Sequence, residues 1–324
     1  MGAGAARQRD SIRAEALLKE CLQRKPGIEA YLLLAGIYQL QQKSDALYAL
    51  AVEALKRFPE EQRFYLVVAT QDGRQARFGN AIQVLEGALR RWPEDPKIKS
   101  LLASSYLGRG IELLDAGDSE VAVHPLRRAT ELAPEDIEAR LNFGRALHNT
   151  HQRVEAIAVF DALVNQQPPV PLARFHRALT SYSMGEFRLA IDDLNLELRH
   201  NAEFAPARLI RGLALMATGA WEAASTDVEL AAAAMPDNPR ALYARTRILI
   251  ETGELEKAEA TLRKAIELDA EDAASLNMLI RLLMRIGRRD EALALTPKAT
   301  ALSTKARKAK PGEILFEKAT RLQR

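Results

Sequence analysis

Several residue classes are scarce in this 324-residue chain, and each scarcity excludes a class of protein. A single cysteine, Cys21, excludes a disulfide framework or a thiolate metal cluster built within the chain. Aromatic residues make up only 6% of the sequence, against 48% hydrophobic residues in all, which favours small and aliphatic packing between helices over a β-sandwich. No apolar run reaches the length of a membrane span, so we expect no transmembrane segment.

Charge and catalytic motifs are also sparse. The formal net charge is only +3, although eight basic residues and two acidic ones lie between Lys298 and Arg324. A basic tail of this size falls short of the basic stripe that a nucleic-acid-binding surface needs, so we expect no nucleic acid partner. Glycine loops that cradle phosphate, the G-x-S-x-G nucleophile motif and paired cysteine motifs do not occur. Without these motifs we predict no cofactor and no catalytic residues. His148 and His151 fall at a turn between helices, so we predict no metal site there.

What the sequence does contain is a repeating unit of 34 residues, clearest at 205–238. This unit has an apolar helix, a glycine turn at Gly219, a second helix and then Pro236. Steps of 34 residues from Pro236 each reach the end of a second helix, at Ala202, Pro168, Pro134 and Ala270. A hairpin of two short helices cannot bury its apolar faces alone, so neighbouring units must stack on one another. The sequence therefore predicts an all-α array of antiparallel helix pairs.

The repeat frame divides the chain into three segments. Residues 1–27 match a second helix that lacks its first helix, so we interpret them as an N-terminal half repeat or cap. Residues 28–296 form the array, with seven full repeats and a last one that we expect Pro297 to cut short. Residues 297–324 form a basic linker followed by the amphipathic stretch EILFEKATRLQR, which we expect to be a helix that caps the final repeat. A partner-docking helix is the alternative for that stretch.

The third repeat is irregular, because Pro93 and Pro134 are 41 residues apart rather than 34. The seven extra residues fall near 107–117 and amount to about two helical turns, so a lengthened first helix would keep its apolar face aligned. Gly110 and Gly117 could each form the turn that follows. We favour Gly117, because it keeps the same five-residue step to the second helix as the unit at 205–238.

The unit resembles the tetratricopeptide repeat, a helix–turn–helix repeat of 34 residues. The family pattern is matched in the unit at 205–238 by Gly212, Leu215, Gly219, Ala224, Ala231 and Pro236. It is matched in the next unit by Leu242, Leu249, Gly253, Ala258 and Ala265. The resemblance implies a right-handed superhelical solenoid, whose first helices line a concave groove that binds an extended peptide or a partner helix. A small residue such as Gly212 lets two helices approach closely, so a larger one would overpack the contact.

The frame of the repeat assigns positions on each first helix to this groove, and from these we select eight as the partner-binding residues: Arg145, Tyr182, Arg240, Tyr243, Arg247, Asn277, Arg281 and Arg285. Arginine with tyrosine suits an acidic or carboxylate-bearing partner, because a guanidinium group can bind a carboxylate through two hydrogen bonds. The alternative is that these are solvated surface arginines. The lysine–asparagine carboxylate clamp of chaperone-binding relatives is absent in register, so we do not predict a chaperone cofactor.

Three further arginines recur at the repeat spacing in the first helices, namely Arg177, Arg211 and Arg245. Asp193 and Asp227 follow the first two by sixteen residues, so we expect each of these arginines to pair with the aspartate of its own helix pair. An anion-binding row of arginines is the alternative. Arg245 faces Thr261 in the same frame, so we expect Arg245 to be the free member of the row.

Together these patterns favour a non-enzymatic scaffold that binds a partner peptide or helix in the groove. The alternative is the recruiting region of a larger enzyme, such as a transferase or kinase, which the half repeat at residues 1–27 would fit. As written, the chain begins without a signal peptide, so we expect a cytoplasmic protein. A periplasmic location would follow if the N-terminus were truncated.

Overall fold

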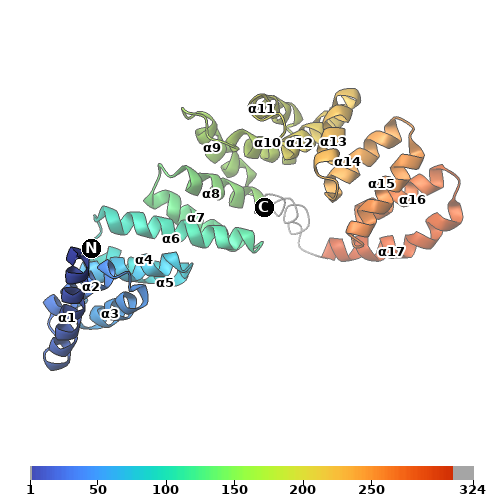
Figure 1. The fold of residues 1–324 in the computed structure, drawn as a ribbon. Helices are drawn as coiled ribbons and strands as arrows, with labels where there is room; N and C mark the ends of the chain where they lie inside the picture. The colour runs from blue at the N-terminus through green and yellow to red at the C-terminus, as the bar shows by residue number, and fades with distance from the viewer. Residues whose placement is uncertain (1, 309–324) are drawn as a thin grey trace. The chain divides into compact units, whose positions relative to one another are not determined.

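The computed structural model describes residues 2–308 as seventeen α-helices, and no β-strand occurs among these residues (Figure 1). After α1 (Gly2–Arg24), the helices form consecutive pairs, which confirms the predicted all-α array. The pairs are α2 (Ile28–Leu40) with α3 (Ser44–Arg57), α4 (Gln62–Arg74) with α5 (Phe78–Arg91), α6 (Pro96–Asp115) with α7 (Ser119–Leu132), α8 (Ile137–Asn149) with α9 (Arg153–Val164), α10 (Ala173–Ser183) with α11 (Phe187–His200), α12 (Ala205–Ala217) with α13 (Trp221–Ala234), α14 (Pro239–Glu251) with α15 (Leu255–Leu268), and α16 (Ala273–Arg285) with α17 (Arg289–Lys308).

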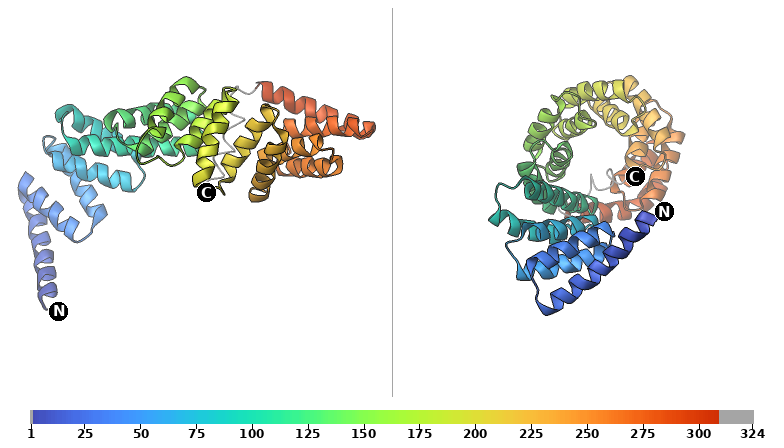
Figure 2. Two further views of the ribbon diagram at one scale, coloured as in Figure 1. Left: turned by 90° about the horizontal axis from the view of Figure 1, so that it is seen from above. Right: turned by 60° about the vertical axis from the view of Figure 1, so that its left-hand side comes forward.

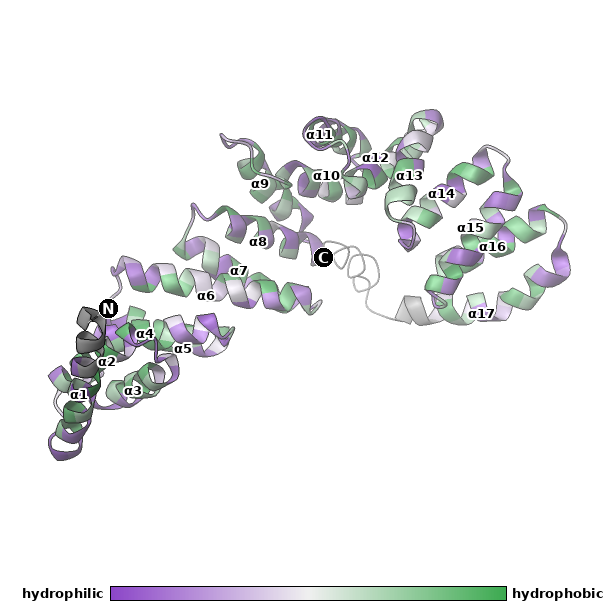
Figure 3. Cartoon of the chain, viewed as in Figure 1, coloured by the Kyte–Doolittle hydropathy of each residue, from purple (hydrophilic) through white to green (hydrophobic). Residues whose placement is uncertain are grey.

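The chain divides into two compact units, residues 1–142 and 143–324. In the first unit, each helix from α1 to α6 packs on the helix that follows it. In the second unit the same holds from α9 to α16, and the helices follow one another along an arc (Figure 2). Hydrophobic and hydrophilic residues are interspersed along the helices (Figure 3). Among the described residues, no helix combines the length and the hydrophobicity that a membrane-spanning segment requires.

Small residues allow the two helices of a pair to pack closely. One alanine recurs near the start of the second helices and is at most 1% exposed, as Ala81, Ala122, Ala156, Ala190, Ala224, Ala258 and Ala292. The facing first helix carries a glycine in several pairs. A Cβ atom added to Gly212 would lie 2.7 Å from Cγ2 of Val228, and one added to Gly144 would lie 2.5 Å from Cε1 of Phe160. The predicted close approach at Gly212 is therefore present, and a side chain there would overpack the contact.

The first helix of the third pair is lengthened. Helix α6 has 20 residues, whereas α4 before it has 13. The turn that follows is at Gly117, with φ of 87°, and Gly110 lies inside the helix, so the choice of Gly117 is confirmed. The corresponding turn residue of every described pair has positive φ: Gln42, Ala76, Gly117, His151, Gly185, Gly219, Gly253 and Gly287.

The last helix departs from the expectation for Pro297. Helix α17 runs without interruption from Arg289 to Lys308, so the prediction that Pro297 cuts the second helix short was wrong. Ala292 and Ala299 are buried on either side of the proline, and this packing holds the helix together although one backbone donor is missing. The carbonyl that loses its partner belongs to Leu293, a residue that is 61% exposed and therefore accessible to water. The capping helix expected in 313–324 lies outside the described residues.

Candidate partner-binding surface

All eight predicted groove residues lie on first helices and in the second unit. They are Arg145 on α8, Tyr182 on α10, Arg240, Tyr243 and Arg247 on α14, and Asn277, Arg281 and Arg285 on α16. Arg281 and Arg285 are exposed, and the other six are partly buried. The eight residues therefore differ in exposure, and the most accessible charged side chains among them lie on α16.

Arg247 makes a contact that extends the predicted set. Its guanidinium carbon lies 5.4 Å from the centre of the Trp221 ring, which is cation–π distance. Trp221 is the first residue of α13 and is partly buried. Sequence reasoning missed Trp221 because the repeat frame assigned only first-helix residues to the groove. Its position directly after the Gly219 turn, in a chain with two tryptophans, was the available signal.

Arg240 links α14 electrostatically to two earlier first helices of the same unit. Burial lowers the pKa of Arg240, and the negative charge that Tyr182 carries when ionised opposes this effect. Burial also lowers the pKa of His148 to about 4, and the positive charges of Arg153, of His151 and of Arg240 act in the same direction. The structure thus brings Arg240 within electrostatic reach of both Tyr182 and His148, although the three residues come from three different helix pairs.

Two buried histidines support this region. Nδ1 of His148 lies 2.9 Å from Oγ1 of Thr180, and that hydroxyl lies 2.8 Å from the backbone carbonyl of His176. Because the hydroxyl proton is donated to the carbonyl, Thr180 accepts a hydrogen bond from Nδ1–H of His148. The ring of His176 stacks on Phe160 at 5.7 Å, and burial, followed by the charges of Arg145 and His148, lowers its pKa to about 3. Both imidazoles are therefore neutral at neutral pH.

On α16 the predicted residues are partly engaged by the chain itself. Nδ2 of Asn277 donates to the backbone carbonyl of Ala273 at 2.7 Å and to Oγ of Ser303 on α17 at 3.2 Å. Nε of Arg281 donates to the backbone carbonyl of Asn277 at 3.3 Å. Asn277 therefore ties α16 to α17, whereas most of the Arg281 guanidinium group faces solvent.

Arg177 and Arg211, the first two members of the recurring arginine row, bind acceptors on both sides. Nε and Nη2 of Arg177 donate to Asp193 at 2.7 and 2.5 Å, and its Nη1 donates to Asp161 of α9 at 2.7 Å. The hydrogen bonds to Asp193 are the main cause that raises the pKa of Arg177. The predicted pairing with the aspartate of the same helix pair is confirmed here.

Arg211 repeats this arrangement one helix pair later. It donates to Asp227 at 2.6 and 2.8 Å and to Oδ1 of Asn195, on α11, at 2.9 Å. Arg245 was predicted to be free, and this was wrong, because its Nε lies 3.0 Å from a carboxylate oxygen of Glu229 on α13. Glu229 precedes Arg245 by sixteen residues, the same separation at which Asn195 precedes Arg211. The prediction considered only the second helix of the same pair and overlooked the second helix of the preceding pair.

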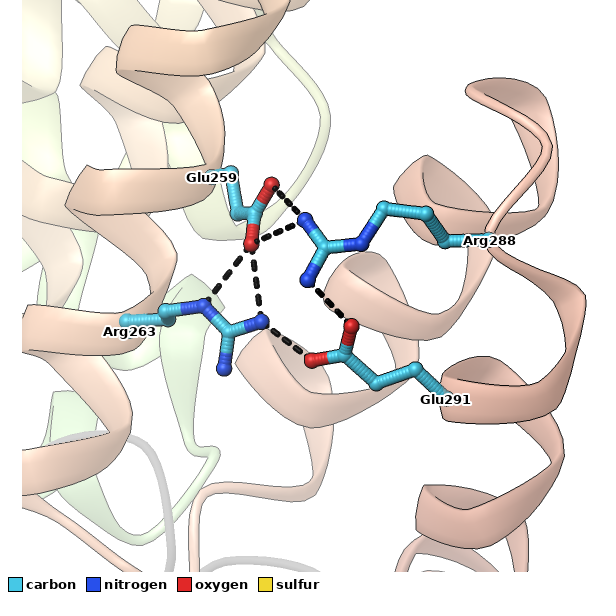
Figure 4. Close-up of polar contacts among 4 residues, drawn as sticks. All are labelled: Glu259, Arg263, Arg288 and Glu291. Carbon is cyan, nitrogen blue, oxygen red and sulfur yellow. Dashed lines mark hydrogen bonds and ion pairs between the residues drawn. The ribbon is translucent and has the colours of Figure 1, made fainter.

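A second ionic cluster joins α15 to the last pair (Figure 4). Nη1 of Arg288 lies 2.8 Å from both carboxylate oxygens of Glu259, and Nη2 of Arg263 lies 2.8 Å from one of them. Glu291 of α17 binds Arg263 and Arg288. These side chains alternate in charge and cross the junction between two helix pairs. Among the described residues, no group of three or more His, Cys, Asp or Glu side chains could hold a metal ion.

Comparisons with known proteins agree with this architecture. A sequence model of the family described as tetratricopeptide repeat matches residues 113–181 and 215–277. DnaJ homolog subfamily C member 3 of Homo sapiens is 32% identical over 81 residues, which cover 25% of this chain and 16% of that protein. The chain thus matches about a sixth of the length of this curated relative.

Among solved structures, the crystal structure of the APC/C hetero-tetramer Cut9–Hcn1 is similar with a TM-score of 0.59 and 13% identity, over 96% of this chain and 58% of that chain. This likeness concerns the fold alone. TTC0263, a thermophilic repeat protein of Thermus thermophilus, gives a TM-score of 0.47 and 22% identity, over 56% of this chain and 99% of that chain.

Proposed function

Because this chain is a tetratricopeptide-repeat protein, we propose that it is a non-enzymatic interaction scaffold that binds a peptide or helix on the first helices of its second unit. The proposed binding surface comprises Arg145, Tyr182, Arg240, Tyr243, Arg247, Asn277, Arg281 and Arg285. Trp221, which contacts Arg247, is added to it. Arginine, tyrosine and tryptophan are the residues most often found at the energetic centre of protein interfaces.

The observation that supports this surface most strongly is that Arg240 lies within electrostatic reach of Tyr182 and of the buried His148. Arg240 and Tyr182 are only partly buried and belong to α14 and α10, so a ligand that binds both would contact two helix pairs at once. The positive charge at Arg240, Arg247 and Arg281 favours a partner with acidic side chains, because guanidinium groups bind carboxylates through paired hydrogen bonds. We therefore propose an acidic peptide or helix as the ligand and a protein, not a nucleic acid, as the partner.

The experiment is a pull-down from the lysate of the source organism, with the full chain as bait and mass spectrometry as readout. The test variant carries Arg247→Glu and Arg281→Glu. A matched control carries Arg188→Glu and Arg199→Glu, two exposed arginines of the second helix α11, so that the change in net charge is the same. We expect one protein to be captured by the wild type and the control and lost with the test variant. If both variants capture the same proteins as the wild type, the proposed surface is wrong.

A further inference from the structure

The junction between α13 and α14 carries two side-chain contacts made by neighbouring residues of α14. Arg245 binds Glu229 at 3.0 Å, and Arg247 lies over the ring of Trp221 at 5.4 Å. Glu229 and Trp221 both belong to α13. The order of the contacts fits antiparallel helices, since the later residue of α14 meets the earlier residue of α13. Two different points of α14 are thus attached to one neighbouring helix.

The side chains of Arg245 and Arg247, which make these two contacts, project from α14 in different directions. Arg245 is two residues from both Tyr243 and Arg247, and two residues of an α-helix correspond to a rotation of about 200°. Tyr243 and Arg247 therefore point away from the face of α14 on which Arg245 lies. An ion pair that holds the side chain of Arg245 on one face of α14 consequently fixes the direction in which the side chains of Tyr243 and Arg247 project from the opposite face.

The rest of the arginine row shows how such a contact is built. Arg177 and Arg211 each bind an acceptor on the preceding second helix, namely Asp161 and Asn195, and an aspartate of their own pair. Arg245 has Thr261 at the place of that aspartate, and the hydroxyl of Thr261 donates to the carbonyl of Lys257. Arg245 is also the most exposed of the three, with 38% of its side-chain surface accessible against 24% for Arg177 and 21% for Arg211. Arg245 thus depends on Glu229 alone among these acceptors.

We propose that Arg245 is a positioning residue of the binding surface: its ion pair with Glu229 fixes the rotation of α14 against α13 and thereby holds Arg247 over Trp221. The proposal rests on the proposed function for its biological meaning. The geometry that it asserts is independent of any partner. Removal of the pair should let α14 rotate and displace Arg247, although Arg247 itself is unchanged.

The fluorescence of Trp221 tests this directly. The chain has two tryptophans, so the full chain with Trp92→Phe leaves Trp221 as the only one. In that background, quenching of Trp221 by acrylamide is measured for Arg245→Met, with Arg247→Ala as the reference for complete loss of the stacked guanidinium group. We expect Arg245→Met to raise the quenching constant by at least half of the increase seen in Arg247→Ala. Arg245→Lys, which keeps a positive charge near Glu229, should restore much of the wild-type value.

Two further variants keep the test decisive. Glu229→Gln removes the ion pair without shortening Arg245 and should reproduce Arg245→Met if that variant folds poorly. Arg263→Met removes an arginine from the ionic cluster of α15 and should leave Trp221 unchanged. Wild-type quenching in both Arg245→Met and Glu229→Gln, with helical circular dichroism retained, would overturn the proposal. A change at Trp221 with undiminished capture of the partner would instead refute the proposed binding surface and leave the positioning role intact.

Discussion

The carboxylate of Asp193 binds both Nε and Nη2 of Arg177, at 2.7 and 2.5 Å, from a side chain that is only 7% exposed. Asp227 is held in the same way by Arg211 one helix pair later, with 3% of its side-chain surface exposed. A buried carboxylate loses its hydration on folding, so its stability in the interior depends on these guanidinium groups. The arginines therefore contribute to stability mainly because the aspartates need them.

Arg211→Met should destabilise the second unit strongly. The substitution leaves the buried carboxylate of Asp227 without its main partner, and we expect a loss of about 3 kcal/mol in the free energy of unfolding. Arg208 keeps a contact to Asp227 at 3.2 Å and limits the effect. Urea denaturation measures the change, with Arg188→Met, at an exposed position, as a control that should stay within about 0.5 kcal/mol. Recovery of most of the loss in Arg211→Met/Asp227→Leu is expected, and its absence would contradict this explanation.

Substitution of alanine for two helical glycines should change the stability of the chain in opposite directions. A Cβ atom at Gly110 of α6 would lie 2.4 Å from Cγ of Leu126, so Gly110→Ala should cost about 1–3 kcal/mol. At Gly36 of α2 nothing lies within 4 Å of an added Cβ atom, so Gly36→Ala should stabilise the chain by about 0.5–1 kcal/mol. Thermal denaturation of the two variants compares them. Equal effects would show that helix propensity, not the contact between α6 and α7, determines both.

The turn at Ala76 is strained in a way that glycine would relieve. Ala76 has φ of 53°, whereas the corresponding turns at Gly185, Gly219, Gly253 and Gly287 use a residue without a Cβ atom. The left-handed conformation costs a residue with a side chain about 1–2 kcal/mol, part of which is offset by the lower entropy of the unfolded alanine. Ala76→Gly should therefore raise the free energy of unfolding by about 0.5–1 kcal/mol, and Gly219→Ala should lower it by a similar amount. Urea denaturation of both variants provides the measurement, and a destabilising Ala76→Gly would be inconsistent with strain at this turn.

Stability should fall below pH 6.5 because His148 and His176 are buried in neutral form. Their pKa values are lowered from 6.5 to about 4 and about 3, so the unfolded chain binds their protons at a higher pH than the folded chain does. The contribution is complete above pH 6.5 and is lost as the pH falls toward the folded pKa values. At pH 5 each histidine should cost about 2 kcal/mol relative to neutral pH.

Urea denaturation at pH 7 and pH 5 tests the histidine effect. His176→Phe keeps an aromatic ring against Phe160 and removes one of the two titrating groups. The difference in stability between the two pH values should therefore shrink by about 2 kcal/mol in this variant. A pH dependence equal to that of the wild type would show that His176 does not contribute to it.

The helix pairs were predictable because their spacing follows from packing inside one unit. Ala224 and Gly212 mark a place where two helices touch, and the same requirement recurs at each repeat, so the 34-residue period is visible in the sequence. The end of a helix depends on more than local residues. Pro297 would terminate an isolated helix, but burial of Ala292 and Ala299 against the rest of the last pair outweighs the missing hydrogen bond.

The contacts of the candidate site were harder to predict from the sequence, because they join different repeats. The pairing of Arg245 with Glu229 crosses from one repeat to the preceding one, and no rule within a single repeat distinguishes Glu229 from other acidic residues of α13. The contact between Arg247 and Trp221 is of the same kind. The electrostatic link from Arg240 to His148 joins helix pairs that are three repeats apart, which no pattern within one repeat could predict.

The sixteen-residue separation of the arginine contacts also bears on how the second unit folds. Asp161 with Arg177, Arg177 with Asp193 and Arg211 with Asp227 each close a short segment of chain. Short closures carry a small entropic penalty and give a low contact order, which is associated with rapid folding. A contact of this kind requires only two adjacent helices, so folding can begin at any repeat and extend to its neighbours in either direction. The same arginines that hold the repeats together in the folded chain are thus placed to join each new repeat as it forms.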